Sequence, residues 1–144
     1  MKKLTTQATL TTYITAGSEN NSIIESVISF IRHDYNVSLN SEKKKEIRSA
    51  LAEAVNKAIT YAYLNKLGKI SVTISIYDNK LLKLKVRDYG RGIEDIDKAR
   101  KPLFTSGASN HTGLGFSVME TFSDKLTVKS TVGKGTVVTM EFKF

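Results

Sequence analysis

The feature that most constrains the fold is a pair of alternating segments separated by a turn. Residues 70–77 alternate isoleucine and valine with serine, threonine and tyrosine, and residues 82–87 alternate leucine and valine with lysine and arginine. Asp78 and Asn79 lie between them and are typical turn residues. Because successive side chains of a strand point to opposite faces, these segments predict a β-hairpin with one apolar, buried face.

Helices that can cover this face are predicted on both sides of the hairpin. Apolar residues recur at helical spacing over residues 23–35 and 41–67, with Gly68 as the expected end of the longer helix. Shorter helices are predicted for residues 94–100 and 113–122. The buried stripe of the longer helix is predicted to contain Ile47, Leu51, Ala54, Val55, Ala58, Ile59 and Ala62.

Three more strands complete the prediction: a threonine-rich edge strand over residues 4–15 and two closing strands over residues 125–131 and 136–144. The natural packing for these elements is one layer of helices on one face of a mixed sheet. At 144 residues without a linker or repeat, the chain is predicted to form a single α+β domain spanning residues 1–144, a two-layer α/β sandwich.

Composition limits the classes of function. There are no cysteines, which excludes cysteine-ligated metal sites, and no apolar run reaches membrane-spanning length. The basic start of the chain leads into threonines rather than the apolar core of a signal peptide, so a cytoplasmic protein is expected. The net charge of +8 suits nucleic acid, an anionic membrane or an acidic protein as a partner, or simply a solvated surface. No recognised nucleic-acid-binding motif accompanies it, so direct binding of nucleic acid or a membrane is not expected.

The candidate site begins where the second strand of the hairpin ends, at Asp88, followed at once by Gly90 and Gly92. A carboxylate there can accept a hydrogen bond from the exocyclic amine of adenine, where guanine offers a carbonyl. Losing that bond in a dry pocket would cost about 1–3 kcal/mol, which is enough to select the base. The alternative is an ordinary strand-end turn, because this glycine pattern is common by itself.

A second glycine turn, Gly113 to Gly115, opens the helix predicted for residues 113–122. The free N–H groups and positive dipole end of a helix start can bind phosphate. Residues 105–113 are small and polar and predict a mobile loop between the two glycine turns. An acidic strand end, two glycine turns and a loop between them together indicate a pocket that closes over a nucleotide.

Glu53 lies inside the longer helix and allows two interpretations. Together with Lys57 it forms an i,i+4 pair in the favourable order, worth about 0.2–0.5 kcal/mol on any helix surface. Alternatively, Glu53 is a general base that polarises a hydroxyl or water attacking a phosphate.

Four segments together resemble the ATP-binding boxes of the GHKL superfamily, and most closely those of the bacterial anti-sigma factor serine kinases of sporulation and stress. The similarity covers about residues 40–144, and the ordered set of boxes is specific although no single box is. The segments are Glu53–Val55, Asp88–Ile93, Ala99–Thr105 and Gly113–Glu120.

The resemblance implies the Bergerat fold, ATP with Mg2+ as the nucleotide and metal, and a homodimer. It also implies that the protein sequesters a sigma factor, most simply the sporulation sigma F, and phosphorylates a serine on an anti-anti-sigma protein. By motif position, Asp88 would contact the adenine amine and Glu53 would be the catalytic base. The other ATP-binding positions that the resemblance implies are Gly90, Gly92, Ile93 and Thr136 near the adenine and Thr105, Gly113, Leu114, Gly115 and Phe116 over the phosphates.

The chain departs from the family pattern at two positions. Lys57 stands where the family has a metal-binding asparagine, and a protonated lysine has no lone pair to offer a cation. Asn56 comes one residue early, about 100° around the helix, so it can serve the metal only if the helix is rotated or irregular. Lys57 could instead neutralise phosphate charge. His111 lies where the family has an arginine, and is either a weaker phosphate partner or a solvated loop residue.

Overall fold

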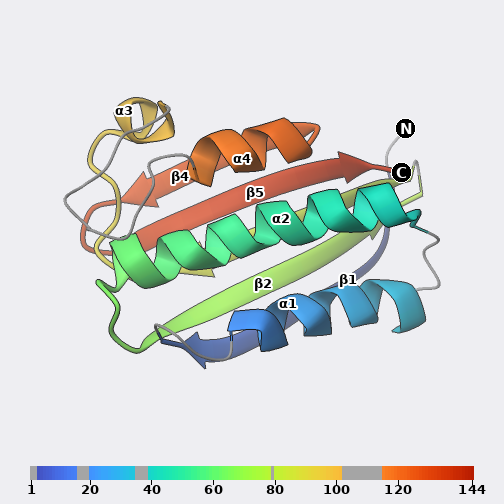
Figure 1. The fold of residues 1–144 in the computed structure, drawn as a ribbon, viewed down its shortest axis with the longest axis horizontal. Helices are drawn as coiled ribbons and strands as arrows, with labels where there is room; N and C mark the ends of the chain where they lie inside the picture. Colours follow the sequence, from blue (N-terminus) through green and yellow to red (C-terminus); the bar gives the residue numbers. More distant parts are fainter. Residues whose placement is uncertain (1–2, 16–19, 35–38, 79, 102–114) are drawn as a thin grey trace.

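The structure is a computed structural model that describes residues 3–15, 20–34, 39–78, 80–101 and 115–144. Strands and helices alternate in groups along these residues (Figure 1). The strands are β1 (Leu4–Ile14), β2 (Gly68–Tyr77), β3 (Leu81–Asp88), β4 (Lys125–Thr131) and β5 (Gly135–Lys143). The helices are α1 (Asn20–Ser29) with its π-helical continuation η1 (Phe30–Asp34), α2 (Ser41–Lys57) with its continuation η2 (Ala58–Ala62), α3 (Ile96–Arg100) and α4 (Gly115–Phe122).

The sheet is antiparallel throughout, with strand order β1-β2-β3-β5-β4. The prediction of a mixed sheet was therefore wrong, although the two-layer α+β architecture is confirmed. The connection from β1 to β2 contains both α1 and α2, and β2 runs antiparallel to β1. The crossover after β3 leads to β4, but β5 inserts between β3 and β4 and pairs antiparallel with both.

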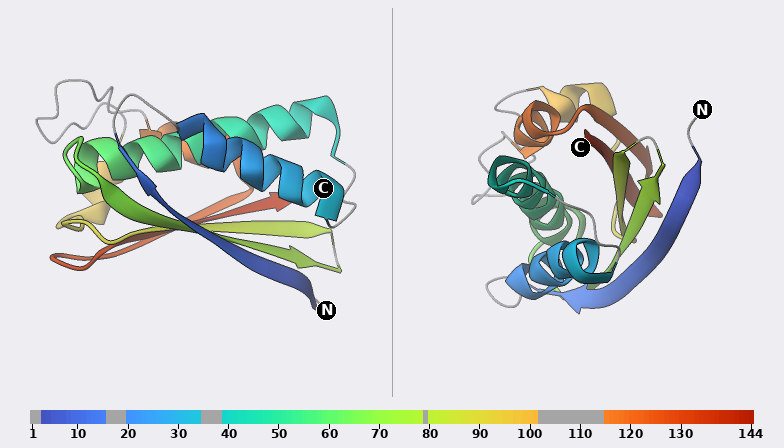
Figure 2. Two further views of the ribbon diagram at one scale, coloured as in Figure 1. Left: turned by 90° about the horizontal axis from the view of Figure 1, so that it is seen from below. Right: turned by 90° about the vertical axis from the view of Figure 1, so that its right-hand side faces the viewer.

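Helices α1, α2 and α4 lie side by side on one face of the sheet (Figure 2). The apolar side chains of β2, β3 and β5 pack against them, with Ile74, Leu84 and Met140 fully buried. All seven residues predicted for the stripe of the longer helix are buried. The hairpin of β2 and β3 is also confirmed, with Lys80 taking the left-handed conformation (φ 59°) at the turn.

The longer helix ends at Ala62 rather than at Leu67, and Gly68 is the first residue of β2 rather than a helix cap. After the π-helical turn, the chain reverses through two residues with positive φ, Leu64 (51°) and Asn65 (65°). A Cβ on Gly68 would lie 2.3 Å from the ring of Tyr63. Glycine is therefore needed here because an aromatic side chain packs on its Cα, which a helical periodicity does not reveal.

The opposite face of the sheet is open and basic. Lys83, Lys85 and Arg87 on β3 point to this face, and the register places Lys125 and Lys129 of β4 on it as well. Within the described residues, no helix is long and apolar enough to cross a membrane.

Candidate functional site

Asp88, the last residue of β3, is held in place by backbone donors from two directions. Its Oδ1 accepts hydrogen bonds from the N–H of Gly90 (3.0 Å) and of Thr136 on β5 (3.2 Å). The side chain is only 9% exposed, and the described part of the chain offers no donor to Oδ2. Burial raises the pKa of this carboxyl, and the two N–H groups oppose the shift. Oδ2 is therefore a buried acceptor available to a ligand.

The backbone around Asp88 is packed too closely to admit side chains at three glycines. A Cβ on Gly90 would lie 2.5 Å from the carbonyl oxygen of Ala62, at the end of η2. A Cβ on Gly135, which has a φ of +126°, would lie 2.2 Å from the carbonyl oxygen of Asp88 itself. Gly92 has a φ of +78° and meets the turn after β4 in the same way. These contacts bring the ends of η2, β3 and β5 together around one carboxylate.

Two side chains that sequence reasoning did not identify complete this frame. Ser130 Oγ accepts the N–H of Ile93 (2.7 Å) and contacts the hydroxyl of Thr136 (2.8 Å). The hydroxyl of Tyr63 donates to the carbonyl of Lys69 and accepts the N–H of Tyr89 (2.7 Å). Neither forms part of a local motif, because each acts on a residue far away in the sequence.

At the other end of the pocket, α2 and the start of α4 are in contact. A Cβ on Gly115 would lie 3.3 Å from Glu53 Oε2 and 3.4 Å from Lys57 Cε. Lys57 is 9% exposed, and its ammonium lies 4.8 Å from the ring centre of Phe116 and 5.6 Å from that of Tyr61. Burial lowers the pKa of Lys57 to about 8, and the charge of Glu53 opposes the shift.

The structure brings these two ends into one pocket. Its lining includes five of the predicted residues, from α2, β3, the segment after β3, α4 and β5: Lys57, Asp88, Ile93, Phe116 and Thr136. The free volume inside is about 10 Å3, roughly the room for a single water. A nucleotide base can therefore enter beside Asp88 only if residues around this pocket shift outward.

Asn56 does not belong to this group. The helix remains α-helical past this point, since Ala58 N–H donates to the carbonyl of Ala54, and the π-helical turn starts only afterwards. Asn56 is consequently exposed on another side of α2, as the 100° offset requires. The predicted residues Thr105, His111, Gly113 and Leu114 lie outside the described residues. The binding and catalytic roles assigned to all these positions stay predictions.

The described residues do not fit a magnesium site. Among them, no group of three or more histidine, cysteine or acidic side chains converges on one point. Glu53 is near the phosphate end of the pocket, but the neighbouring position is an ammonium rather than an oxygen ligand. Magnesium requires near-octahedral oxygen ligands and is repelled by a cation beside it.

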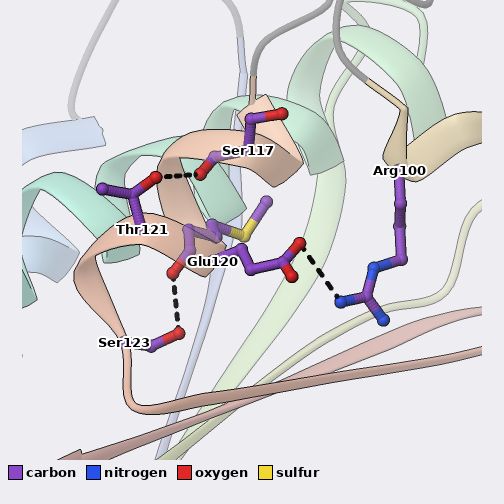
Figure 3. Close-up of polar contacts among 6 residues, drawn as sticks. Arg100, Ser117, Glu120, Thr121 and Ser123 are labelled. Carbon is purple, nitrogen blue, oxygen red and sulfur yellow. Dashed lines mark hydrogen bonds and ion pairs between the residues drawn. The ribbon is translucent and has the colours of Figure 1, made fainter.

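Helix α4, whose first residue faces Glu53 and Lys57, is supported along its outer side (Figure 3). Thr121 donates to the carbonyl of Ser117 (2.8 Å) and Ser123 to that of Met119 (2.7 Å). Arg100 of α3 reaches Glu120 at 3.5 Å, an exposed ion pair of small energy. The main anchors of α4 are the fully buried Met119 and Phe116.

Comparison with known proteins identifies the fold and the family. Residues 24–142 match the histidine kinase-like ATPase domain. The chain belongs to this family. A similar solved structure is the mycobacterial sensor histidine kinase MprB, with a TM-score of 0.60 and 14% identity over 93% of this chain and 97% of that one. At this identity the similarity shows the fold of the ATPase domain alone.

More similar relatives of this ATPase domain are named anti-sigma F factors. That of Caldanaerobacter subterraneus subsp. tengcongensis is 42% identical over 124 residues, which are 85% of each chain. That of Clostridium acetobutylicum is 38% identical over 130 residues, 90% of this chain and 89% of that protein. The family resemblance seen in the sequence is confirmed.

Proposed function

We propose that this ATPase domain is an ATP-binding anti-sigma factor that holds a sigma factor and phosphorylates a serine on an anti-anti-sigma protein. The observation that carries the proposal is the buried carboxylate of Asp88, whose Oδ1 is occupied by two backbone N–H groups and whose Oδ2 has no donor in the described chain. Adenine supplies an amine that satisfies such an acceptor.

ATP binding is supported by membership in an ATPase domain family and by the composition of the pocket. Ile93, Val86 and Phe116 supply apolar walls for a base, and Thr136 supplies a hydroxyl next to Asp88. Gly115 opens α4 at the opposite end, where helix N–H groups favour phosphate. The pocket therefore has a base end and an anionic end.

Regulation of a sigma factor is supported by relatives that carry the name anti-sigma F factor over most of this chain. On that ground the partner is a sigma factor, most simply the sporulation sigma F. A cytoplasmic homodimer is proposed from the family resemblance of the sequence alone.

For the kinase step, Glu53 is the general base because it is half-buried on α2 beside the start of α4. Glu53 accepts the proton of the substrate serine as the serine oxygen bonds to the γ-phosphorus. The bond from that phosphorus to the β,γ-bridging oxygen breaks, and ADP leaves with the electron pair. Positioning and electrostatics supply most of the acceleration in such transfers.

The test uses the purified chain with labelled ATP, a sigma factor and an anti-anti-sigma protein from the same organism. We expect the sigma factor to co-elute with the chain, and label to appear on one serine of the antagonist and to disappear with Glu53→Gln. Co-elution without transfer would reject the kinase step alone. Absence of both would reject the proposal.

A second candidate is a binding module that holds nucleotide and sigma factor but transfers phosphate poorly. Lys57 favours it, because an ammonium lies in the pocket where the kinases of this type are expected to use an amide oxygen for metal. Under this alternative, Lys57→Asn raises the rate of antagonist phosphorylation. An unchanged or lower rate contradicts it.

A further inference from the structure

The nucleotide pocket contains a positive charge of its own. Lys57 lies on the pocket side of α2, 9% exposed, and its stem contacts the start of α4 next to Glu53. Its ammonium lies near the rings of Phe116 and Tyr61, at 4.8 and 5.6 Å from their centres. The pocket therefore carries a buried ammonium on the side of α2 that faces Phe116, and an ammonium forms its strongest contacts with anionic oxygens.

The same position argues against a divalent cation. Asn56, the amide that precedes Lys57 in the sequence, is exposed on a different side of α2. The described residues contain no cluster of acidic or histidine side chains that could ligate a metal. A divalent ion beside the ammonium of Lys57 would be repelled, and a protonated lysine offers such an ion no lone pair.

We propose that Lys57 takes the place of the magnesium ion and that this protein binds ATP without a divalent metal. The inference rests on the proposed function, since it assumes that ATP enters this pocket. On entry the base and phosphates displace Lys57 and Phe116 from the almost filled volume beside Asp88. The four-carbon stem of Lys57 lets the ammonium swing from the rings to the phosphate oxygens, where it neutralises charge that a metal would otherwise neutralise.

The direct test is calorimetric titration of ATP into the wild-type chain at pH 7, once with EDTA and once with MgCl2. We expect the two dissociation constants to agree within about fivefold, because the ammonium supplies the counter-charge in both. Binding that is more than fivefold tighter with MgCl2, or detectable only with it, overturns the inference and leaves the proposed function intact. Absence of binding in both buffers overturns both.

Variants assign the effect to the one side chain. Lys57→Met keeps the length and burial of the stem but removes the charge, and we expect it to weaken ATP binding in EDTA about tenfold or more. Lys45→Met, an exposed lysine on the same helix, is the matched control and should bind as the wild type does. Equal affinity of Lys57→Met and Lys45→Met in EDTA contradicts the assignment to Lys57.

A gain of metal dependence gives an independent check. Lys57→Asn restores an amide oxygen at the pocket position, so we expect its ATP affinity to become higher with MgCl2 than with EDTA, unlike that of the wild type. If Lys57→Asn and wild type respond identically to magnesium, Lys57 does not replace the metal. Thermal unfolding without nucleotide confirms that each variant is folded before it is titrated.

Discussion

The two ends of the pocket differ in the kind of contact that holds them together. Around Asp88 the contacts are between backbones: Gly135 packs on the carbonyl of Asp88, Gly90 packs on that of Ala62, and two N–H groups fix one carboxylate oxygen. Around Lys57 side chains lie against one another, with its ammonium near the rings of Phe116 and Tyr61. A backbone frame resists substitution, whereas side chains can be exchanged without disturbing the fold. We therefore expect substitutions at the Asp88 end to disturb the fold, and substitutions at the Lys57 end to change phosphate binding while the fold is kept.

The largest expected effect is a difference in the free energy of unfolding between two glycine-to-alanine variants, one at each end of the pocket. In Gly135→Ala the new Cβ would lie 2.2 Å from the carbonyl oxygen of Asp88 at a φ of +126°, so we expect a loss of about 2–4 kcal/mol in the free energy of unfolding. In Gly115→Ala the nearest atoms are 3.3–3.4 Å away and belong to the movable side chains of Glu53 and Lys57. Here we expect a change of about 1 kcal/mol or less, because alanine favours the helix.

Urea denaturation of both variants measures these values. Gly133→Ala is the control for backbone strain, because Gly133 has a φ of +84° and nothing within 4 Å of its added Cβ. If Gly115→Ala costs as much as Gly135→Ala, the two ends are equally rigid and the contrast fails.

The next effect concerns the choice of base. Asp88 offers an acceptor that suits the adenine amine and opposes the guanine carbonyl, so ATP should bind more tightly than GTP by about 1–3 kcal/mol, or about 5- to 150-fold. Competition of each nucleotide against a fluorescent ATP analogue measures this ratio. Equal affinities would show that the backbone frame does not select the base.

A smaller effect follows from the pKa of Lys57, which burial lowers to about 8. Bound phosphate raises that pKa, so nucleotide affinity should fall as pH rises above about 8, by at most about tenfold per pH unit. Lys57→Arg keeps its charge over this range and should show a flat profile. Titrations of ATP between about pH 7.5 and about pH 9 distinguish the two proteins, because only the affinity of the wild type should fall with rising pH. Equal slopes would contradict the role of the ammonium.

The lowered pKa of Lys57 also affects the stability of the fold, which should rise with pH whereas nucleotide affinity falls. The unfolded chain, in which Lys57 has its ordinary pKa of 10.5, binds more protons than the folded chain between about pH 8 and that value. This residue therefore makes the protein more stable as pH rises through that window. Glu53 lies beside it on α2 and opposes the shift, and Asp88 faces the same pocket from β3.

The smallest effect is expected at the ion pair between Arg100 of α3 and Glu120 of α4. At 3.5 Å and with both side chains partly exposed, its coupling energy should be about 0.5 kcal/mol or less. A double-mutant cycle with Arg100→Ala and Glu120→Ala measures it. A coupling energy well above about 1 kcal/mol would mean that this ion pair, and not only the packing of apolar side chains, fixes the position of α4.

Local patterns predicted much of this molecule. The hairpin of β2 and β3, the buried stripe of α2 and the place of Asp88 at a strand end all follow from periods of 2 and 3.6 residues. The same helical geometry predicted that Asn56 and Lys57 would point to different sides, and the structure shows Asn56 exposed and Lys57 in the pocket. These features depend on neighbours within a few residues in the sequence.

What could not be predicted depends on long-range register. The insertion of β5 between β3 and β4 pairs Asp88 with Thr136, and only this pairing reveals why Gly135 must lack a side chain. Ser130 likewise acquires its role from its approach to Ile93. The periodicity that extended the long helix beyond Ala62 does not detect the π-helical turn or the reversal that follows it.

The most direct measurement of the central claim is calorimetric titration of ATP into Asp88→Asn beside the wild type. The amide oxygen of asparagine can still accept hydrogen bonds from the N–H groups of Gly90 and Thr136. Its NH2 group, however, is a donor and would face the amine of adenine, which is also a donor. Asp97→Asn, an exposed acid on α3, is the control. We predict about tenfold or weaker ATP binding for Asp88→Asn with an unchanged fold. ATP binding as tight as in the wild type would contradict the account.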